Sequence, residues 1–85
     1  MELFTERVLQ VVMGIPRGET MTYAEVAQAA GSPRAFRAVG AVMKKNYNSD
    51  VPCHRVIRSD GTLGQYNRGG REAKARKLRR EGAIR

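Results

Sequence analysis

The first regular pattern along the chain is a helical one between Leu3 and Met13. Apolar side chains recur there at intervals of three and four residues, which places them on one face of an α-helix. These apolar positions are Leu3, Phe4, Val8, Val11 and Val12. Gly14, Pro16 and Gly18 end the pattern, so we expect the first helix to stop near Met13.

A second helix is predicted from a capping box. Thr22 and Glu25 stand three residues apart, so their side chains can satisfy free amides at a helix start, and Gly31 can close the helix in a left-handed conformation. Ser32 can then cap a third helix with Pro33 at its first position. Two short helices joined by so short a turn indicate a helix-turn-helix.

The third helix is predicted to have one apolar face and one basic face that also carries small side chains. Phe36, Val39 and Met43 fall on the apolar side. The other side carries Arg34, Arg37, Ala38, Ala41, Lys44 and Lys45. Its small residues would let the backbone come close to a partner, as a helix in a nucleic-acid groove requires, although such residues are also common on any exposed helix.

Short strands and a last helix complete the predicted fold. Residues 56–58 and 62–63 flank Ser59-Asp60-Gly61, which is typical of a tight hairpin turn. Residues 71–81 are predicted to form a charged helix that Gly82 ends. We therefore expect a mainly α fold, a winged helix-turn-helix with a short β-hairpin wing and a C-terminal helix, in a single domain over residues 1–85.

Length and composition narrow the class of protein. A chain of 85 residues builds only a small core, and no apolar run approaches the roughly 18 residues that cross a bilayer. Nothing at its start is typical of a signal peptide, so we expect a cytoplasmic monomer, nucleoid-associated in a prokaryote, with no membrane partner. One cysteine and one histidine cannot form a disulfide or a zinc site, so neither a metal nor another cofactor is expected.

The charge of the chain points to a polyanionic partner. The formal net charge is +8, and 12 of the 16 basic residues are arginines. The planar guanidinium suits phosphate oxygens and groove edges better than an ammonium does, which favours nucleic acid as the partner. The alternative is a well-solvated surface with no specific role.

Cys53 and His54, the only residues of their types, are adjacent in the chain. A thiol becomes a competent nucleophile when neighbouring groups accept its proton or stabilise the thiolate. His54, Arg55 and Arg58 supply such groups close in sequence. Without further context, a lone cysteine is more often a small buried hydrophobe and a lone histidine a structural hydrogen-bonding group.

Pro52-Cys53-His54-Arg55-Val56 resembles the active-site signature of the O6-alkylguanine-DNA alkyltransferases, the methylated-DNA–protein-cysteine methyltransferases. The resemblance covers nearly the whole chain, and specifically the C-terminal DNA-binding and active-site domain of that family. Further landmarks, in family order, are Ile15-Pro16-Arg17-Gly18, Thr22-Tyr23, residues 32–40, Asn46, Gly61, Gly64, Tyr66 and Glu81-Gly82.

The resemblance implies single-turnover repair of double-stranded DNA that contains O6-alkylguanine, and also of O4-alkylthymine. Cys53 would take the alkyl group irreversibly after the damaged nucleotide is flipped out, with His54 accepting the thiol proton through a water. Glu81 would hold the His54 tautomer, Tyr23 would donate to the leaving base, and Asn46 would fix the turn around Cys53. Their simpler roles would be packing for Tyr23, pairing with Lys77 for Glu81 and helix capping for Asn46.

DNA binding and the substrate pocket are also implied by the resemblance. Arg37 would fill the space of the flipped base, while the third helix lies in the minor groove; its simpler role would be to bind phosphate. The DNA-binding residues would be Tyr23, Arg34, Ala35, Arg37, Ala38, Lys45 and Arg55. The pocket would be formed by Val56, Gly64, Tyr66 and Asn67.

The chain departs from the family pattern in three places. The family's N-terminal domain is expected to be absent, the loop at residues 47–50 lacks prolines, and Asn67-Arg68 makes the pocket loop about one residue longer than in some relatives. The loop length leaves the preferred alkyl size open, and Arg68 and Arg71 near it could add phosphate contacts.

Three other functions compete with alkyl transfer. An alkyltransferase-like damage sensor would flip the base without transfer, but such relatives replace the cysteine that this chain keeps. A winged-helix transcription regulator explains the charge but not Cys53 beside His54. A thiol hydrolase lacks any sign of an oxyanion site.

Overall fold

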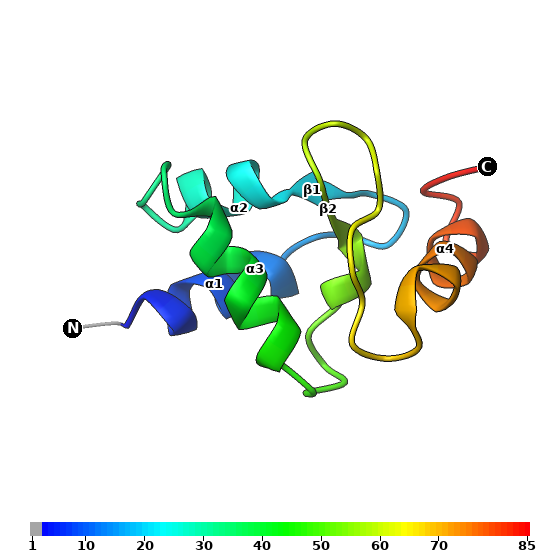
Figure 1. Cartoon of the computed structure of the whole chain (residues 1–85), viewed down its shortest axis with the longest axis horizontal. Coiled ribbons are helices and arrows are strands. Elements are labelled where there is room, and N and C mark those ends of the chain that lie inside the picture. Colours follow the sequence, from blue (N-terminus) through cyan, green and yellow to red (C-terminus); the bar gives the residue numbers. More distant parts are fainter. Residues whose placement is uncertain (1–2) are drawn as a thin grey trace.

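A computed structural model describes residues 3–85 of the chain, so the first two residues of the expected domain lie outside the description. The fold is mainly helical with a short two-stranded sheet (Figure 1). The elements are α1 (Phe4–Met13), β1 (Met21–Thr22), α2 (Tyr23–Ala29), α3 (Phe36–Lys45), the 3₁₀ turn η1 (Cys53–Arg55), β2 (Val56–Ile57) and α4 (Gly70–Arg80). No helix within residues 3–85 has the length and apolar character needed to cross a bilayer.

The first three helices pack around one hydrophobic core, and this confirms the helix-turn-helix predicted from the capping box and the short turn. Val8 and Val12 of α1, Val26 of α2 and Val39 of α3 are completely buried in it. Burial of each such side chain stabilises the fold by about 1.5–3 kcal/mol before entropy is counted. The small core therefore fixes how α3 is presented at the surface.

The ends of α2 form as the sequence predicts. The Thr22 hydroxyl accepts from the Glu25 amide at 3.0 Å, and the Glu25 carboxylate accepts from the Thr22 amide at 2.9 Å. At the other end Gly31 has φ +88°, and the Ser32 amide donates back to the Ala27 carbonyl at 3.0 Å. This Schellman arrangement turns the chain sharply toward α3.

The start of α3 was predicted wrongly. The helix begins at Phe36, after Ala35 as its N-cap, and Ser32 does not cap it. The Ala35 amide instead donates to the Ser32 carbonyl at 2.9 Å, which closes a turn with Pro33 at its second position. Proline favours that turn position as much as a first helical position, and here the turn is adopted.

The predicted hairpin was wrong in its pairing. β2 pairs in parallel with β1, with Met21 beside Val56 and Thr22 beside Ile57. The expected turn does form, since the Arg58 amide donates to the Thr62 carbonyl at 3.0 Å, but residues 62–63 make no strand. The Asp60 carboxylate accepts from the Thr62 amide at 2.9 Å, and this local bond withdraws the amide from a strand ladder.

α4 is the charged C-terminal helix that the sequence predicts, displaced by one residue, and it packs against η1 (Figure 1). Lys74 on this helix is completely buried. Its ammonium donates to the carbonyls of Leu63 and Gln65 and lies 5.8 Å from the centre of the Tyr23 ring. Burial lowers the pKa of Lys74 to about 8, although the nearby Cys53 opposes this shift.

We expect Lys74→Met to remove a pH dependence of stability. The pKa of Lys74 is about 8 in the folded protein and near 10.5 in an unfolded chain, so the folded state loses this proton first. Stability of the wild-type protein should therefore rise as pH increases from about 8 toward 10.5.

Urea unfolding at two pH values inside this window measures the effect. Lys44→Met, which removes an exposed lysine on α3, is the control and should keep the wild-type pH dependence. An unchanged pH dependence in Lys74→Met would contradict the expectation.

Candidate active site and nucleic-acid interface

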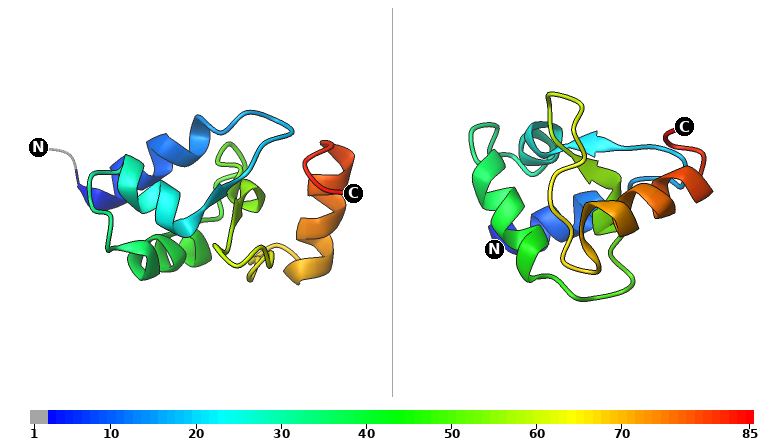
Figure 2. Two further views of the ribbon diagram at one scale, coloured as in Figure 1. Left: turned by 90° about the horizontal axis from the view of Figure 1, so that it is seen from above. Right: turned by 45° about the vertical axis from the view of Figure 1, so that its right-hand side comes forward.

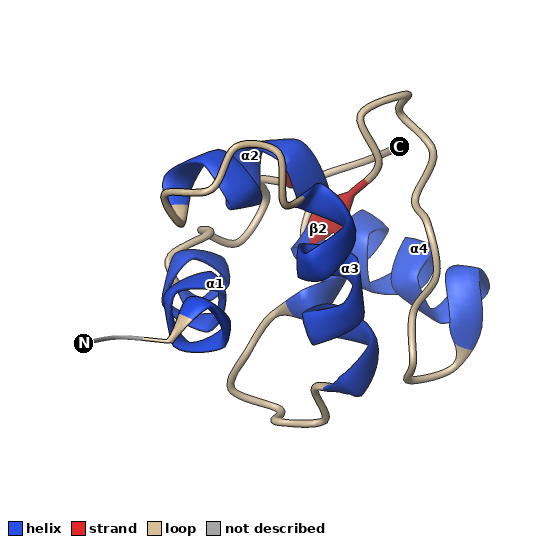
Figure 3. Ribbon diagram, turned by 60° about the vertical axis from the view of Figure 1, so that its left-hand side comes forward, coloured by secondary structure: helices blue, strands red, loops and turns tan. Residues whose placement is uncertain are grey.

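The candidate site is a groove between α3 and the loop that connects β2 to α4. Arg37, Gly40, Ala41 and Lys44 of α3 line one side, and residues 58–60, 65–67 and 70–71 line the other. Figure 2 shows this loop running between α3 and α4, and Figure 3 shows it without regular structure along this stretch. Tyr23 and Cys53 also line the groove, so the single thiol opens onto a largely basic surface.

Cys53 is held by the turn that carries it. Its side chain is 6% exposed, and its Sγ atom accepts a hydrogen bond from Asn46 Nδ2 at 3.0 Å. The Cys53 amide donates to the Val51 carbonyl at 2.8 Å, and the Arg55 amide donates to the Pro52 carbonyl at 3.0 Å. Asn46 also ends α3, so this one residue connects the helix to the sulfur.

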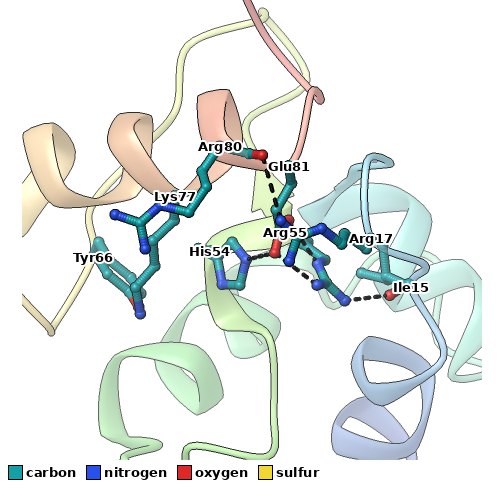
Figure 4. A network of polar contacts seen from close by, with 8 residues as sticks. All are labelled: Ile15, Arg17, His54, Arg55, Tyr66, Lys77, Arg80 and Glu81. Atoms are coloured by element: carbon teal, nitrogen blue, oxygen red, sulfur yellow. Dashed lines mark hydrogen bonds and ion pairs between the residues drawn. The ribbon is translucent and has the colours of Figure 1, made fainter.

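His54 and Glu81, which are far apart in sequence, meet through their side chains. The distance from His54 Nε2 to Glu81 Oε2 is 2.9 Å, and Figure 4 shows the contact between η1 and the end of α4. Hydrogen bonds from Arg55 and, more weakly, His54 lower the pKa of Glu81 to about 2. Since Glu81 is a carboxylate, Nε2 carries the proton and Nδ1 of His54 is an acceptor.

The histidine is neutral at physiological pH. Burial lowers the pKa of His54, and the hydrogen bond and charge of Glu81 oppose this shift only in part. A neutral imidazole with one nitrogen free to accept is the state that a general base needs.

Arg55 takes a different place from the one predicted. Its guanidinium donates to both oxygens of Glu81, at 3.0 and 2.7 Å, and to the Ile15 carbonyl at 2.8 Å (Figure 4). Arg55 thus binds within the protein and does not line the groove with Arg37. Its proximity to Cys53 in sequence gave no sign of this, because the partner lies 26 residues away.

Tyr23 lines the groove next to Gly64, which belongs to the pocket loop, residues 62–69. Burial raises the pKa of Tyr23, so its hydroxyl stays protonated and can donate. Gly64 has φ +75°, and a Cβ atom at this position would lie 3.3 Å from the Tyr23 hydroxyl. Only glycine therefore allows the loop to approach Tyr23 this closely without strain.

Tyr66 and Asn67 form the wall of the groove. Tyr66 is 8% exposed, and Lys77 Nζ donates to its hydroxyl at 2.7 Å. The Asn67 amide nitrogen donates to carbonyls at the end of α3. Both residues line the groove together with Cys53, as their predicted roles require.

The other predicted residues divide between the groove, the surface and the core. Arg37 and Lys45 line the groove, whereas Arg34 and Ala38 are exposed outside it and Ala35 caps α3. The Val56 side chain is completely buried in the core, so it is not a wall of the groove. Among residues 3–85 no group of three or more acidic, histidine or cysteine side chains could hold a metal ion.

The sequence did not lead us to expect that Lys74 is buried or that Arg58 lines the groove. Lys74 lies four residues before Leu78, the one large aliphatic residue of α4, so it shares the face that packs inward. This spacing was the available signal, but a lysine on a highly charged helix is usually exposed.

Comparisons with known proteins agree with this geometry. Residues 3–83 match the family model for the 6-O-methylguanine DNA methyltransferase, DNA binding domain. The chain is 52% identical over 80 residues to a methylated-DNA–protein-cysteine methyltransferase of Methanothermobacter thermautotrophicus, covering 93% of this chain and 44% of that protein. It is 49% identical over 61 residues to the DNA base-flipping protein of Escherichia coli, covering 71% of this chain and 47% of that protein.

A solved structure has the same fold. Mycobacterium tuberculosis OGT in complex with DNA superimposes with a TM-score of 0.87 at 41% identity, covering 95% of this chain and 49% of that one. The chain thus spans about half the length of the relatives it matches. From the match over residues 3–83, together with the shared fold, the chain belongs to the family of 6-O-methylguanine DNA methyltransferase DNA-binding domains.

Proposed function

We propose that this chain transfers an alkyl group from the O6 atom of guanine in double-stranded DNA to Cys53, once per molecule. The observation that carries this proposal is the single thiol at the basic groove, with Asn46 on its sulfur and the His54–Glu81 pair next to it in the chain. The wider substrate range proposed with it includes O4-alkylthymine. Because a thioether does not hydrolyse readily, no step regenerates the thiol.

The proton of the thiol leaves toward His54. With Nε2 bound to Glu81, Nδ1 accepts the proton through a bridging water. Glu81 remains ionised, since its pKa is about 2, and stabilises the imidazolium that forms. The Asn46 amide donates to Sγ and so stabilises the thiolate.

The guanine leaves with the electron pair of the broken bond. The sulfur forms a bond to the alkyl carbon as the bond from that carbon to O6 breaks, and negative charge develops on the base. Tyr23, whose pKa is raised by burial, donates a hydrogen bond to the base in this step. The buried Lys74 ammonium, close to both Tyr23 and Cys53, adds a positive charge to the same region.

The reacting atom must be brought out of the duplex. Enzymes that act on a base inside a stack extrude it, and the vacated space is then filled by a protein side chain. Arg37 stands on the groove side of α3, next to the small residues Gly40 and Ala41 that allow close approach of DNA. We assign the filling role to Arg37, and phosphate contacts to Lys45 and Arg34.

Base flipping without transfer is the second candidate. It is favoured by the 49% identity with the DNA base-flipping protein of Escherichia coli. Cys53, with its Asn46 contact, argues for transfer. The two functions differ in whether a covalent product forms.

We expect one methyl group on Cys53 after incubation with duplex DNA that contains a single O6-methylguanine. Intact-mass spectrometry followed by peptide mapping measures the product. Cys53→Ser should bind the same DNA and take up nothing, because a hydroxyl is a far weaker nucleophile than a thiolate. Binding without any mass increase in the wild-type protein would establish the second candidate.

Arg37→Ala should lose most of its activity on duplex DNA and keep it on free O6-benzylguanine. The free base needs no extrusion, so only the duplex reaction requires the filling side chain, and removal of this side chain should cost about 10-fold or more in rate. Arg76→Ala, which removes an exposed arginine of α4 that does not line the groove, is the matched control. Equal losses on the two substrates would remove the assigned role of Arg37.

As the pH is lowered, the rate of methyl transfer should stay constant down to about pH 6.5 and fall only at lower pH. Burial lowers the pKa of His54 from 6.5, so the imidazole is still neutral at that pH and can accept the thiol proton. Single-turnover rates across the pH range, with DNA binding measured in parallel, test this. A loss of rate with its midpoint above pH 6.5 would exclude His54 as the base.

A further inference from the structure

The pocket loop, residues 62–69, has no regular secondary structure, although it forms one wall of the groove. A wall without internal helix or sheet bonds takes its position from the side chains that fasten it. The loop is fastened on two sides. On the α4 side Lys74 binds the carbonyls of Leu63 and Gln65, and Lys77 binds the Tyr66 hydroxyl.

Asn67 fastens the loop on the α3 side. Its Nδ2 atom donates to the carbonyls of Lys44 and Asn46, both at 2.8 Å, and approaches the Met43 carbonyl at 3.2 Å. The last carbonyls of a helix lack partners within it, so the end of α3 offers acceptors for this amide. In the described part of the chain these are the hydrogen bonds that join the pocket loop to α3.

The chemistry of this contact requires a donor. Three carbonyl oxygens surround one side-chain atom, so that atom is the amide nitrogen, and its two hydrogens are shared among them. Asn67 Oδ1 is buried and has no partner within residues 3–85, so the residue is held through its nitrogen alone. A carboxylate in its place would keep the shape and repel the carbonyls.

The same contact reaches the reacting sulfur. Asn46, whose carbonyl accepts from Asn67, donates its own amide to Cys53 Sγ at 3.0 Å. Asn67 and Cys53 both line the groove. Asn46, the residue that caps the end of α3, thus helps to position both the nucleophile and the loop that faces it.

We propose that Asn67 is a positioning residue that limits the size of the alkyl group accepted at Cys53. By holding the pocket loop against the end of α3, it fixes the space between the loop and the sulfur, and loss of these hydrogen bonds would let that space widen. This inference rests on the proposed alkyl transfer and adds a determinant of its substrate range.

The test compares two substrates in one protein. Single-turnover rates are measured on the same duplex carrying either O6-methylguanine or O6-benzylguanine, and the benzyl-to-methyl ratio is taken. Asn67→Ala and Asn67→Asp should each raise this ratio by about fivefold or more, because a released loop admits the larger group while the methyl group needs no extra room. The ratio is independent of the folded fraction, since both rates come from the same preparation.

A matched control removes the same amide elsewhere. Asn48→Ala changes an exposed asparagine in the loop after α3 that does not line the groove, and it should leave the ratio unchanged. Amide hydrogen exchange should also become faster in residues 65–69 of both Asn67 variants, but not in α4.

The outcomes separate this inference from the function on which it rests. Methyl uptake by the wild-type protein with an unchanged ratio in the Asn67 variants overturns the inference alone, as does an equal change in Asn48→Ala. No methyl uptake by the wild-type protein removes the proposed function and the inference with it. A raised ratio confined to the Asn67 variants supports both.

Discussion

The arrangement of the site depends on the hydrogen bonds that the Glu81 carboxylate accepts. This carboxylate accepts from His54 and from two nitrogens of Arg55, and Arg55 in turn donates to the Ile15 carbonyl after α1. One carboxylate therefore holds the end of α4, the turn that carries Cys53 and the chain after the first helix. Because Glu81 is 9% exposed in its side chain, the ion pair is poorly screened by water, and loss of one partner would leave a buried charge.

Charged and polar side chains make contacts inside this small domain as well as lying on its surface. A core of this size buries little apolar area. The C-terminal half of the chain is held largely by polar side chains that bind backbone carbonyls. Lys74 binds the pocket loop to α4, and Asn67 binds the same loop to α3. The wall of the groove is consequently positioned by hydrogen bonds from two opposite sides, which leaves the groove itself open for a ligand.

Burial determines which basic residues are available to a ligand and which make contacts inside the protein. Arg37 and Lys45 face the groove, where their charges stay available to a polyanion. Arg55 and Lys74 instead donate to acceptors inside the protein, and burial lowers the pKa of Lys74. The formal charge of +8 thus overstates the number of cations that can meet DNA.

The sequence by itself determined the elements that local chemistry dictates. The apolar spacing of α1, the Thr22–Glu25 capping box, and the glycines at 31 and 82 each act within a few residues, and all are found where they were predicted. Cys53, His54, Asn46 and Glu81 could be named together only through their resemblance to a family. Tertiary structure alone decided that β2 pairs with β1, that Arg55 and His54 share Glu81, and that Lys74 is buried. These contacts join residues 9 to 35 positions apart in the chain. Their free energy depends on which surfaces the packed helices bring together, and no local sequence pattern contains that information.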